Sequence, residues 1–253
     1  MVVAFAIIIL SGNLSAQVVT SGADDGTSGT LRQEILDASP GGVITFAVGV
    51  STVTLNSEIE IDKDITISGG LVLNNTIDAN GNGRIFNITS GSVILDDLNL
   101  INGVKADGGA VYIANADLFI NDCEFNDNTT NGTSGSGGAL LSIGGDVLIE
   151  ATIFETNSAV RAGGAIEVID GSLTILNSDF YANDVDGVAG VAAPGNGGAI
   201  HITGAAMISI ETSEFFDNSA ANEGGALWNQ VNSTMNVYEV SVDSNTAADG
   251  GGV

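Results

Sequence analysis

Gly163-Gly164-Ala165-Ile166 and, 17 residues after its first glycine, Phe180-Tyr181-Ala182-Asn183 decide the fold of this chain, because the pair recurs. The Gly-Gly-Ala-aliphatic element also begins at residues 108, 137, 197 and 224, and Gly250 opens a further copy. The first glycine and the Phe position are 17 or 18 residues apart, whereas 5 to 14 residues separate the Asn from the next Gly-Gly. Length changes are confined to one corner of the repeat, which predicts a solenoid of stacked turns.

Within each repeat, apolar residues alternate with polar ones, as in Leu173-x-Ile175 and Ser178-x-Phe180. A period of two is typical of strands, and no repeat holds a long apolar run of helical period. Three short strands and three turns in about 26 residues predict a parallel β-helix of seven or eight turns. The weaker patterns Ile59-x-Ile61 and Ile65-x-Ile67 indicate that the turns begin well before the first Gly-Gly.

Stacked strands lie about 4.8 Å apart, so equivalent positions of successive turns become neighbours in columns. One column is aromatic and is expected to point inward: Phe125, Phe154, Phe180 and Phe215. A second is aliphatic: Val111, Leu140, Ile166, Ile200 and Leu227. A third is a column of amides at a turn, where side chains can bond one another and the backbone: Asn128, Asn157, Asn183, Asn218 and Asn245.

The chain divides into three parts. Residues 1–16 are expected to be a signal peptide, since Val2 to Leu10 is apolar and Leu14-Ser15-Ala16 resembles a cleavage site; the alternative is a buried first strand. Residues 17–40 form an N-terminal cap with a short helix from Thr30 to Ala38, opened by a capping box of Thr30 and Gln33. Residues 41–253 form the β-helix, and because the chain stops on an inward position we expect a fragment truncated at its C-terminal end.

The chain is strongly acidic, with 31 acidic and 5 basic residues and a net charge of -26. This charge excludes nucleic acid as a main partner, because phosphate binding needs clustered Lys and Arg. It suits a secreted protein in saline or Ca²⁺-containing surroundings. The one cysteine, Cys123, takes the inward slot held by Thr152, Ser178 and Ser213 in other turns, and is expected to be a core residue.

The Gly-Gly-Ala-aliphatic and Phe-x-x-Asn elements resemble the repeats of the chlamydial polymorphic outer membrane proteins, and of other bacterial surface proteins, over about residues 104–253. The helix Thr30 to Ile35 followed by Gly42 to Phe46 is similar to the start of secreted β-helix proteins. The resemblance implies an all-β, right-handed parallel β-helix of the pectin-lyase-like kind with a short N-terminal capping helix. It also implies an autotransporter adhesin, secreted or held at the cell surface or outer membrane.

Parallel β-helices also serve as polysaccharide lyases and glycoside hydrolases, so a carbohydrate-active enzyme is the alternative. A lyase needs a Lys or Arg base beside Ca²⁺ carboxylates, and none of the five basic residues pairs with an acidic cluster in the expected columns. His201, the single histidine, follows Gly-Gly-Ala-Ile and lacks the Gly-His-Gly context of polygalacturonases. No catalytic residue is therefore predicted.

Two carboxylate pairs occupy equivalent outward positions of neighbouring turns: Asp97 with Asp122, and Asp179 with Glu214. Such pairs are solvated surface acids, Ca²⁺ ligands or, at the spacing of retaining glycosidases, catalytic acids. We rank them in that order. Ca²⁺ is the one candidate ion, and no cofactor is required.

The outward residues of the Gly-Gly-Ala strands form a mixed aromatic and polar column: Tyr112, Leu141, Glu167, His201 and Trp228. Tyr112, His201 and Trp228 are the candidate ligand-binding residues. The insertions Thr129 to Ser136 and Asp184 to Asn196 are expected to project from one edge. We expect a partner to contact this edge, with the Tyr112 to Trp228 face as the next candidate. The alternative is that the two segments are only tolerated insertions.

These observations predict a secreted or cell-surface bacterial protein that acts without catalysis as an adhesin or structural stalk. Its expected partner is a cell-surface protein or glycan. We expect a monomeric solenoid without a transmembrane segment in this fragment.

Overall fold

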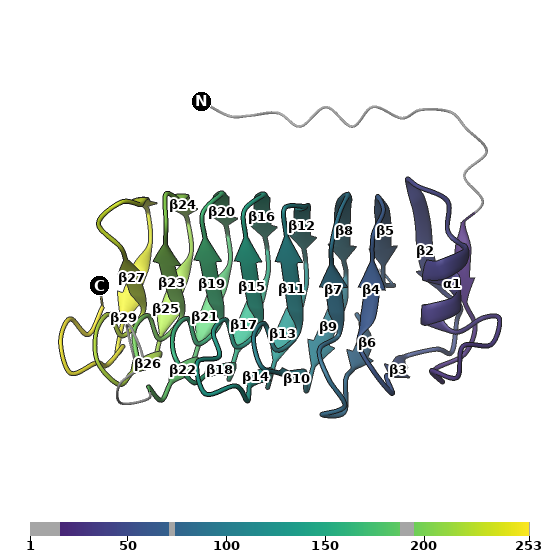
Figure 1. The fold of residues 1–253 in the computed structure, drawn as a ribbon, viewed down its shortest axis with the longest axis horizontal. Helices are drawn as coiled ribbons and strands as arrows, with labels where there is room; N and C mark the ends of the chain where they lie inside the picture. Colours follow the sequence, from purple (N-terminus) through teal and green to yellow (C-terminus); the bar gives the residue numbers. More distant parts are fainter. Residues whose placement is uncertain (1–15, 71–73, 188–194, 253) are drawn as a thin grey trace.

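The computed structural model describes residues 16–70, 74–187 and 195–252. These residues wind into about eight turns of a parallel β-solenoid, so the predicted parallel β-helix is confirmed. Figure 1 shows the turns side by side along the long axis, from the helix-bearing N-terminal end to the last C-terminal turn. The right-handed coil stays a prediction, which the handedness rule for parallel crossovers supports.

Three long sheets run along the solenoid. The nine-stranded sheet contains β1 (Gln17–Val19), β2 (Gly42–Phe46), β5 (Ile65–Ser68), β8 (Ser92–Asp96), β12 (Asp117–Asn121), β16 (Asp146–Glu150), β20 (Ser172–Leu176), β24 (Met207–Glu211) and β28 (Thr234–Tyr238). The eight-stranded sheet contains β3 (Thr52–Thr54), β6 (Asn75–Asp78), β9 (Leu98–Ile101), β13 (Glu124–Asn126), β17 (Ile153–Glu155), β21 (Asp179–Tyr181), β25 (Glu214–Phe216) and β29 (Ser241–Asp243). The seven-stranded sheet contains β4 (Ile59–Ile61), β7 (Phe86–Ile88), β11 (Val111–Ala114), β15 (Leu140–Ile143), β19 (Ile166–Ile169), β23 (Ile200–Thr203) and β27 (Leu227–Asn229).

A fourth sheet was not predicted, because its strands have only two residues and carry no readable alternation. Its five strands are β10 (Val104–Lys105), β14 (Thr129–Thr130), β18 (Ser158–Ala159), β22 (Asp184–Val185) and β26 (Ser219–Ala220). The short sheet follows the eight-stranded sheet in each turn and leads into the Gly-Gly corner. Three strands per turn was therefore an incomplete prediction for the later turns.

The predicted core columns are confirmed. Phe125, Phe154, Phe180 and Phe215 stack face to face with ring centroids 4.7, 4.8 and 4.6 Å apart, and all are buried. The amide column forms a ladder in which Asn157 Nδ2 donates to Asn183 Oδ1 and to the Phe125 carbonyl, each at 2.9 Å. The four amides before Asn245 each bond the amide of the next turn, and every amide of the column satisfies a carbonyl of the turn before it, which locks the register.

The two glycines of each Gly-Gly corner serve different needs. The first has a left-handed backbone, as at Gly163 with a φ of +63°, which L-residues adopt at a cost of about 1–2 kcal/mol. The second has no room for a side chain, since a Cβ on Gly164 would lie 2.0 Å from the Gly198 carbonyl oxygen of the next turn. The Gly-Gly pair is therefore required for two reasons: the first glycine adopts a left-handed turn conformation, and the second allows the backbone of the next turn to approach closely.

The inward slot of Cys123 carries a hydroxyl ladder that sequence analysis did not predict. The backbone N–H of Thr152 donates to Ser178 Oγ, and that of Ser178 donates to Ser213 Oγ, each at 3.1 Å. Cys123 is buried at the start of this ladder, and its burial raises the pKa of the thiol to about 12. The predicted core role of Cys123 is confirmed.

The N-terminal cap contains α1 (Leu31–Asp37), which buries Leu31 and Ile35 against the first turn. The predicted capping box is wrong: the Thr30 hydroxyl donates to the Thr27 carbonyl, and Glu34, not Gln33, accepts from the Gly29 N–H. No helix in the described ranges has the length and apolarity to cross a bilayer. The expected signal peptide lies outside the described residues, apart from Ala16.

Candidate functional site

The five outward residues of the Gly-Gly-Ala strands are aligned as predicted. Tyr112 pairs with Leu141, Leu141 with Glu167, Glu167 with His201, and His201 with Trp228, one from each of β11, β15, β19, β23 and β27. We call these five residues the covered column.

The middle of the covered column is buried, although its residues point away from the core as predicted. Leu141 is 4% exposed, and Glu167 and His201 are 0% exposed. The Gly-Gly corner explains this burial, because it folds back over the strand that follows it. A Cβ on Gly163 would lie 2.2 Å from the Ile166 carbonyl oxygen and 3.0 Å from the Glu167 nitrogen.

A buried charged network holds the centre of the covered column. Arg161 Nη2 lies 2.7 Å from Glu167 Oε1, and Arg161 Nε donates to Ser136 Oγ at 2.8 Å. Glu167 Oε2 lies 3.1 Å from His201 Nδ1, without an aligned hydrogen bond. Burial alone would raise the pKa of Glu167, but His201 and the Arg161 guanidinium outweigh it and hold that pKa below its ordinary value.

The aromatic ends of the covered column are half-buried and have partners within the chain. Trp228 stacks on His201 with centroids 4.4 Å apart, and its Nε1 donates to Glu223 Oε2 at 2.8 Å. Arg84 lies 4.8 Å over the Tyr112 ring and donates to the Gly108 carbonyl. This geometry gives Tyr112, His201 and Trp228 structural roles, and ligand binding by them stays untested.

The Asp179 and Glu214 pair is in register on β21 and β25, as predicted. Burial, and then the charge of Glu214, raise the pKa of Asp179. The Tyr181 hydroxyl donates to Glu214 Oε2 at 3.5 Å, and burial followed by the charge of Asp179 raises the pKa of Tyr181. The pair therefore carries mutual repulsion that a proton or a cation would relieve.

Asp97 and Asp122 lie at the corner between the nine- and eight-stranded sheets, where both have left-handed backbones with φ of 53° and 49°. Burial, then the charges of Asp96 and Asp122, raise the pKa of Asp97. Ca²⁺ prefers six to eight oxygen ligands, so either pair would have to draw most of a coordination shell from water and backbone carbonyls. In the described parts of the chain, no three His, Cys, Asp or Glu side chains gather as a metal site.

All five basic side chains are engaged within the chain. Arg32 pairs with Asp24 at 2.7 Å, and Lys105 pairs with Glu58 at 3.1 Å, with Arg84 at 3.6 Å from the same carboxylate. Arg161 pairs with Glu167, and Lys63 Nζ donates to carbonyls at the C-terminal end of α1, including that of Leu36 at 3.1 Å. The carboxylate pairs described above thus have no basic neighbour to act as a lyase base.

The two predicted insertions leave the solenoid from the same short sheet. The predicted bounds begin too early: Thr129 and Thr130 form β14, and Asp184 and Val185 form β22, so the residues that leave the short sheet begin after these strands. Residues 188–194 of the second insertion lie outside the described residues. The contact surface expected on these loops therefore stays a prediction.

The chain is similar to a bacterial membrane protein repeat and to a probable autotransporter. The Chlamydia polymorphic membrane protein repeat matches residues 212–230, which contain the Phe215, Asn218 and Gly224-Gly225-Ala226-Leu227 elements. A probable autotransporter, YfaL of Escherichia coli strain K12, is 30% identical over 190 residues. That alignment covers 64% of this chain and 14% of the relative, so the chain matches only a small part of that protein's length.

The predicted resemblance is confirmed: residues 212–230 match the polymorphic membrane protein repeat, and they lie on a parallel β-solenoid. Sequence reasoning missed Arg84, Arg161 and Glu223, which cover the aromatic and charged outward residues. Arg161 and Glu223 lie two residues and one residue before a Gly-Gly corner, and Arg84 lies two residues before β7. That position was the available signal, because the alternation of apolar and polar residues begins only with the strand itself.

Proposed function

We propose that this chain is an exposed segment of a bacterial cell-surface protein, acting without catalysis as an adhesin or as the stalk of one. The similarity to the Chlamydia polymorphic membrane protein repeat and to a probable autotransporter supports a surface, adhesin-type protein. It supports a position at the cell surface or outer membrane. A cell-surface protein or a glycan is the partner class we propose.

One observation carries the proposal: the residues that match the polymorphic membrane protein repeat are the same residues that stack one turn on the next. The Phe stack, the Asn ladder and the Gly-Gly corners all serve the continuity of the solenoid. The basic residues and the histidine likewise pair within the chain. A scaffold of this kind presents its outward faces rigidly, as recognition surfaces require.

An adhesion assay tests the proposal. Beads coated with the folded chain should attach to epithelial or bacterial cells more than beads coated with the same chain after heat unfolding. In parallel, the chain is incubated with polygalacturonate, alginate and neutral polysaccharides. Release of unsaturated or reducing ends would favour the enzyme alternative, and equal attachment of folded and unfolded chain would reject the adhesin.

Ca²⁺ is proposed as a stabilising ion at the two carboxylate pairs. A ligand that binds only the folded state stabilises it by mass action. Millimolar Ca²⁺ should therefore raise the thermal midpoint beyond what NaCl of matched ionic strength gives. The Asp179→Asn/Asp97→Asn variant is the control, and an equal rise in that variant would assign the effect to screening.

A further inference from the structure

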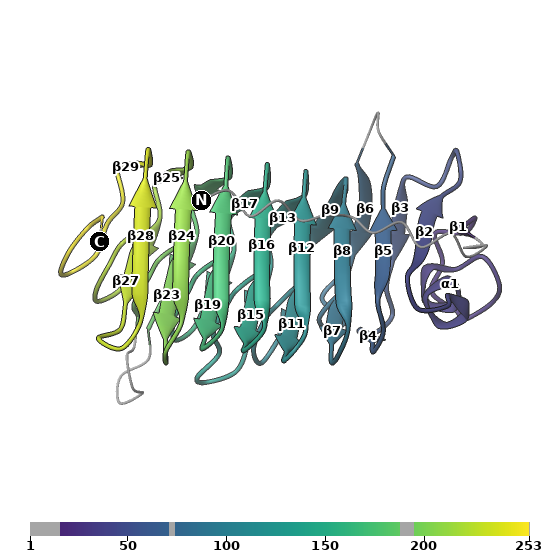
Figure 2. The same cartoon turned by 90° about the horizontal axis from the view of Figure 1, so that it is seen from above.

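The outward face of the nine-stranded sheet differs from the covered column, because no Gly-Gly corner folds back over it. We call this face, over β8 to β28, the open face. Figure 2 shows its strands as an almost flat row with no other described element lying across β8 to β24. Its side chains stand in three columns fixed by the parallel register of the strands.

The central column of the open face changes character along the solenoid. On β8, β12 and β16 it holds Ile94, Phe119 and Leu148, which are large and apolar. On β20, β24 and β28 the same register holds Thr174, Ser209 and Asn236, which are small or polar. The loss of side-chain volume leaves a hollow of about 190 Å³ lined by Ser172, Thr174, Met207, Ile208, Ser209 and Asn236.

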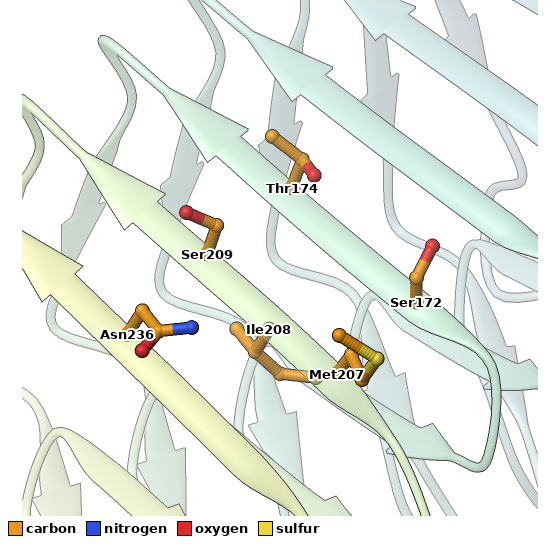
Figure 3. Close-up of a pocket in the computed structure, with 6 residues that line it drawn as sticks. All are labelled: Ser172, Thr174, Met207, Ile208, Ser209 and Asn236. Carbon is orange, nitrogen blue, oxygen red and sulfur yellow. The ribbon is translucent and has the colours of Figure 1, made fainter. Parts of the chain in front are cut away.

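Figure 3 shows the hydroxyl and amide groups of this hollow on three neighbouring strands, with Met207 at one side. Ser172 Oγ donates to Asp146 at 2.6 Å, and Ser209 Oγ makes one long bond of 3.4 Å to Glu211. The Thr174 hydroxyl and the Asn236 amide have no hydrogen-bond partner among the described residues. These two side chains leave several donors and acceptors available to a ligand.

Apolar and aromatic groups border the polar floor. Met207 is 66% exposed, and Tyr238, two residues beyond Asn236 on the same face of β28, is 63% exposed. This surface matches a ligand that has hydroxyl groups at its edge and C–H groups on one face. The Tyr238 ring offers an apolar surface to the C–H groups, and the Thr174 and Asn236 side chains offer hydrogen bonds to the hydroxyls.

The charge of the surroundings selects among such ligands. None of the six lining residues is charged, in a chain of net charge -26. Glu211 stands between Leu176 and Tyr238 in the adjoining column, and Asp146 lies beside Ser172. Sulfated or uronate-bearing ligands would meet these carboxylates without a cation to offset them, since the five basic side chains are engaged elsewhere.

We propose that the hollow between β20, β24 and β28 binds a neutral saccharide unit, with Thr174 and Asn236 bonding its hydroxyls and Tyr238 packing on its C–H face. The inference rests on the proposed adhesive function and names the site and ligand class for it. The occupant is a glycan of the opposing surface, since hydroxyl-rich and uncharged chemistry fits the lining better than a polypeptide with charged side chains.

Filling the hollow tests the proposal. The double variant Thr174→Leu/Ser209→Leu extends the apolar column of Ile94, Phe119 and Leu148 into the hollow. Both substitutions are at outward positions, so the core is unchanged. Thr66→Leu is the matched control, because Thr66 on β5 pairs with Ile94 on β8 and so continues the central column just beyond the open face, far from the hollow. The whole chain is measured against neutral oligosaccharides of glucose, galactose, mannose and N-acetylglucosamine, with oligogalacturonate and heparin as acidic probes.

The native chain and Thr66→Leu should bind at least one neutral oligosaccharide, and the filled variant should bind it at least tenfold more weakly at an unchanged thermal midpoint. Asn236→Ala should also weaken binding, as a second variant that does not depend on the filled hollow folding well. Absence of neutral binding, equal binding by the filled variant, or preference for the acidic probes would overturn the inference.

Bead adhesion, measured with the same variants, separates this inference from the proposed function. Adhesion that survives in the filled variant, or that is lost when the target cells are treated with protease but not with glycosidases, would overturn the saccharide site and leave an adhesin. Failure of the native chain to adhere to any cell would reject the proposed function itself.

Discussion

The covered column and the open face are both built from outward strand positions, but they differ in exposure to solvent. Both are outward positions of parallel strands in strict register, one on the seven-stranded sheet and one on the nine-stranded sheet. In the first, His201 and Glu167 are fully buried under the returning chain, whereas in the second Met207 is 66% exposed. Strand alternation identifies which side chains point away from the core, and a separate feature, the Gly-Gly corner, decides whether water reaches them.

The largest expected effect comes from breaking the corner that creates the difference. Gly164→Ala would place a Cβ 2.0 Å from the Gly198 carbonyl oxygen and 2.7 Å from the backbone nitrogen and oxygen of Asp184. Because both neighbours are backbone, the turns must separate, and we expect a loss of about 3 kcal/mol or more in the free energy of unfolding. Urea unfolding measures it.

Gly26→Ala is the control for the corner. Gly26 has a φ of +74° and nothing within 4 Å of an added Cβ, so the substitution tests backbone conformation alone. It should cost about 1–2 kcal/mol. A Gly164→Ala variant no less stable than Gly26→Ala would show that the close approach between turns is absent.

The second largest effect compares the stability cost of disturbing a buried carboxylate with that of removing an exposed one. Arg161→Met keeps side-chain volume but leaves Glu167 buried beside His201 alone, and we expect a loss of about 3 kcal/mol. Asp146→Asn on the open face should change stability by less than about 0.5 kcal/mol, since its carboxylate is exposed. The double variant Arg161→Met/Glu167→Gln should recover most of the loss, and equal costs for the two single variants would contradict the comparison.

The smallest effect concerns pH. The folded state raises the pKa of Asp179, so this group opposes folding in full above the raised folded pKa; the opposition weakens as pH falls through that value and is gone below the unfolded pKa. Asp179→Asn should therefore stabilise the chain near neutral pH by less than about 1 kcal/mol, because solvent screens the pair. Glu167 has the opposite effect on stability. Its pKa is lowered in the folded state, so it stabilises the fold above its unfolded pKa, and this stabilisation is lost as pH falls through its folded pKa.

Thermal midpoints of the native chain and of Asp179→Asn, recorded from neutral to acidic pH, measure the effect. The two curves should converge in acid, where Asp179 is protonated in both folded and unfolded states. A difference in thermal midpoint that widened in acid would contradict the claim that ionised Asp179 destabilises the fold.

The fold could be predicted from the sequence because each column repeats a residue type at a fixed offset, as Phe180 and Asn183 do with respect to Gly163. The alignment of Glu167 with His201 and of Asp179 with Glu214 followed from the same register. The two-residue strands, the covering of His201 and the hollow beside Thr174 could not be predicted in this way. They depend on the path of the chain between strands and on the volumes of neighbouring side chains.

The most direct test of the comparison is the chemical accessibility of two side chains in one sample. His201 is the single histidine, so modification by diethyl pyrocarbonate reports on the covered column, and oxidation of Met207 by dilute peroxide reports on the open face. Mass spectrometry of the folded chain should show Met207 oxidised at the rate of a free methionine. His201 should stay unmodified until the chain is unfolded in urea. Modification of His201 in the folded chain at the rate of free imidazole would contradict the covered column.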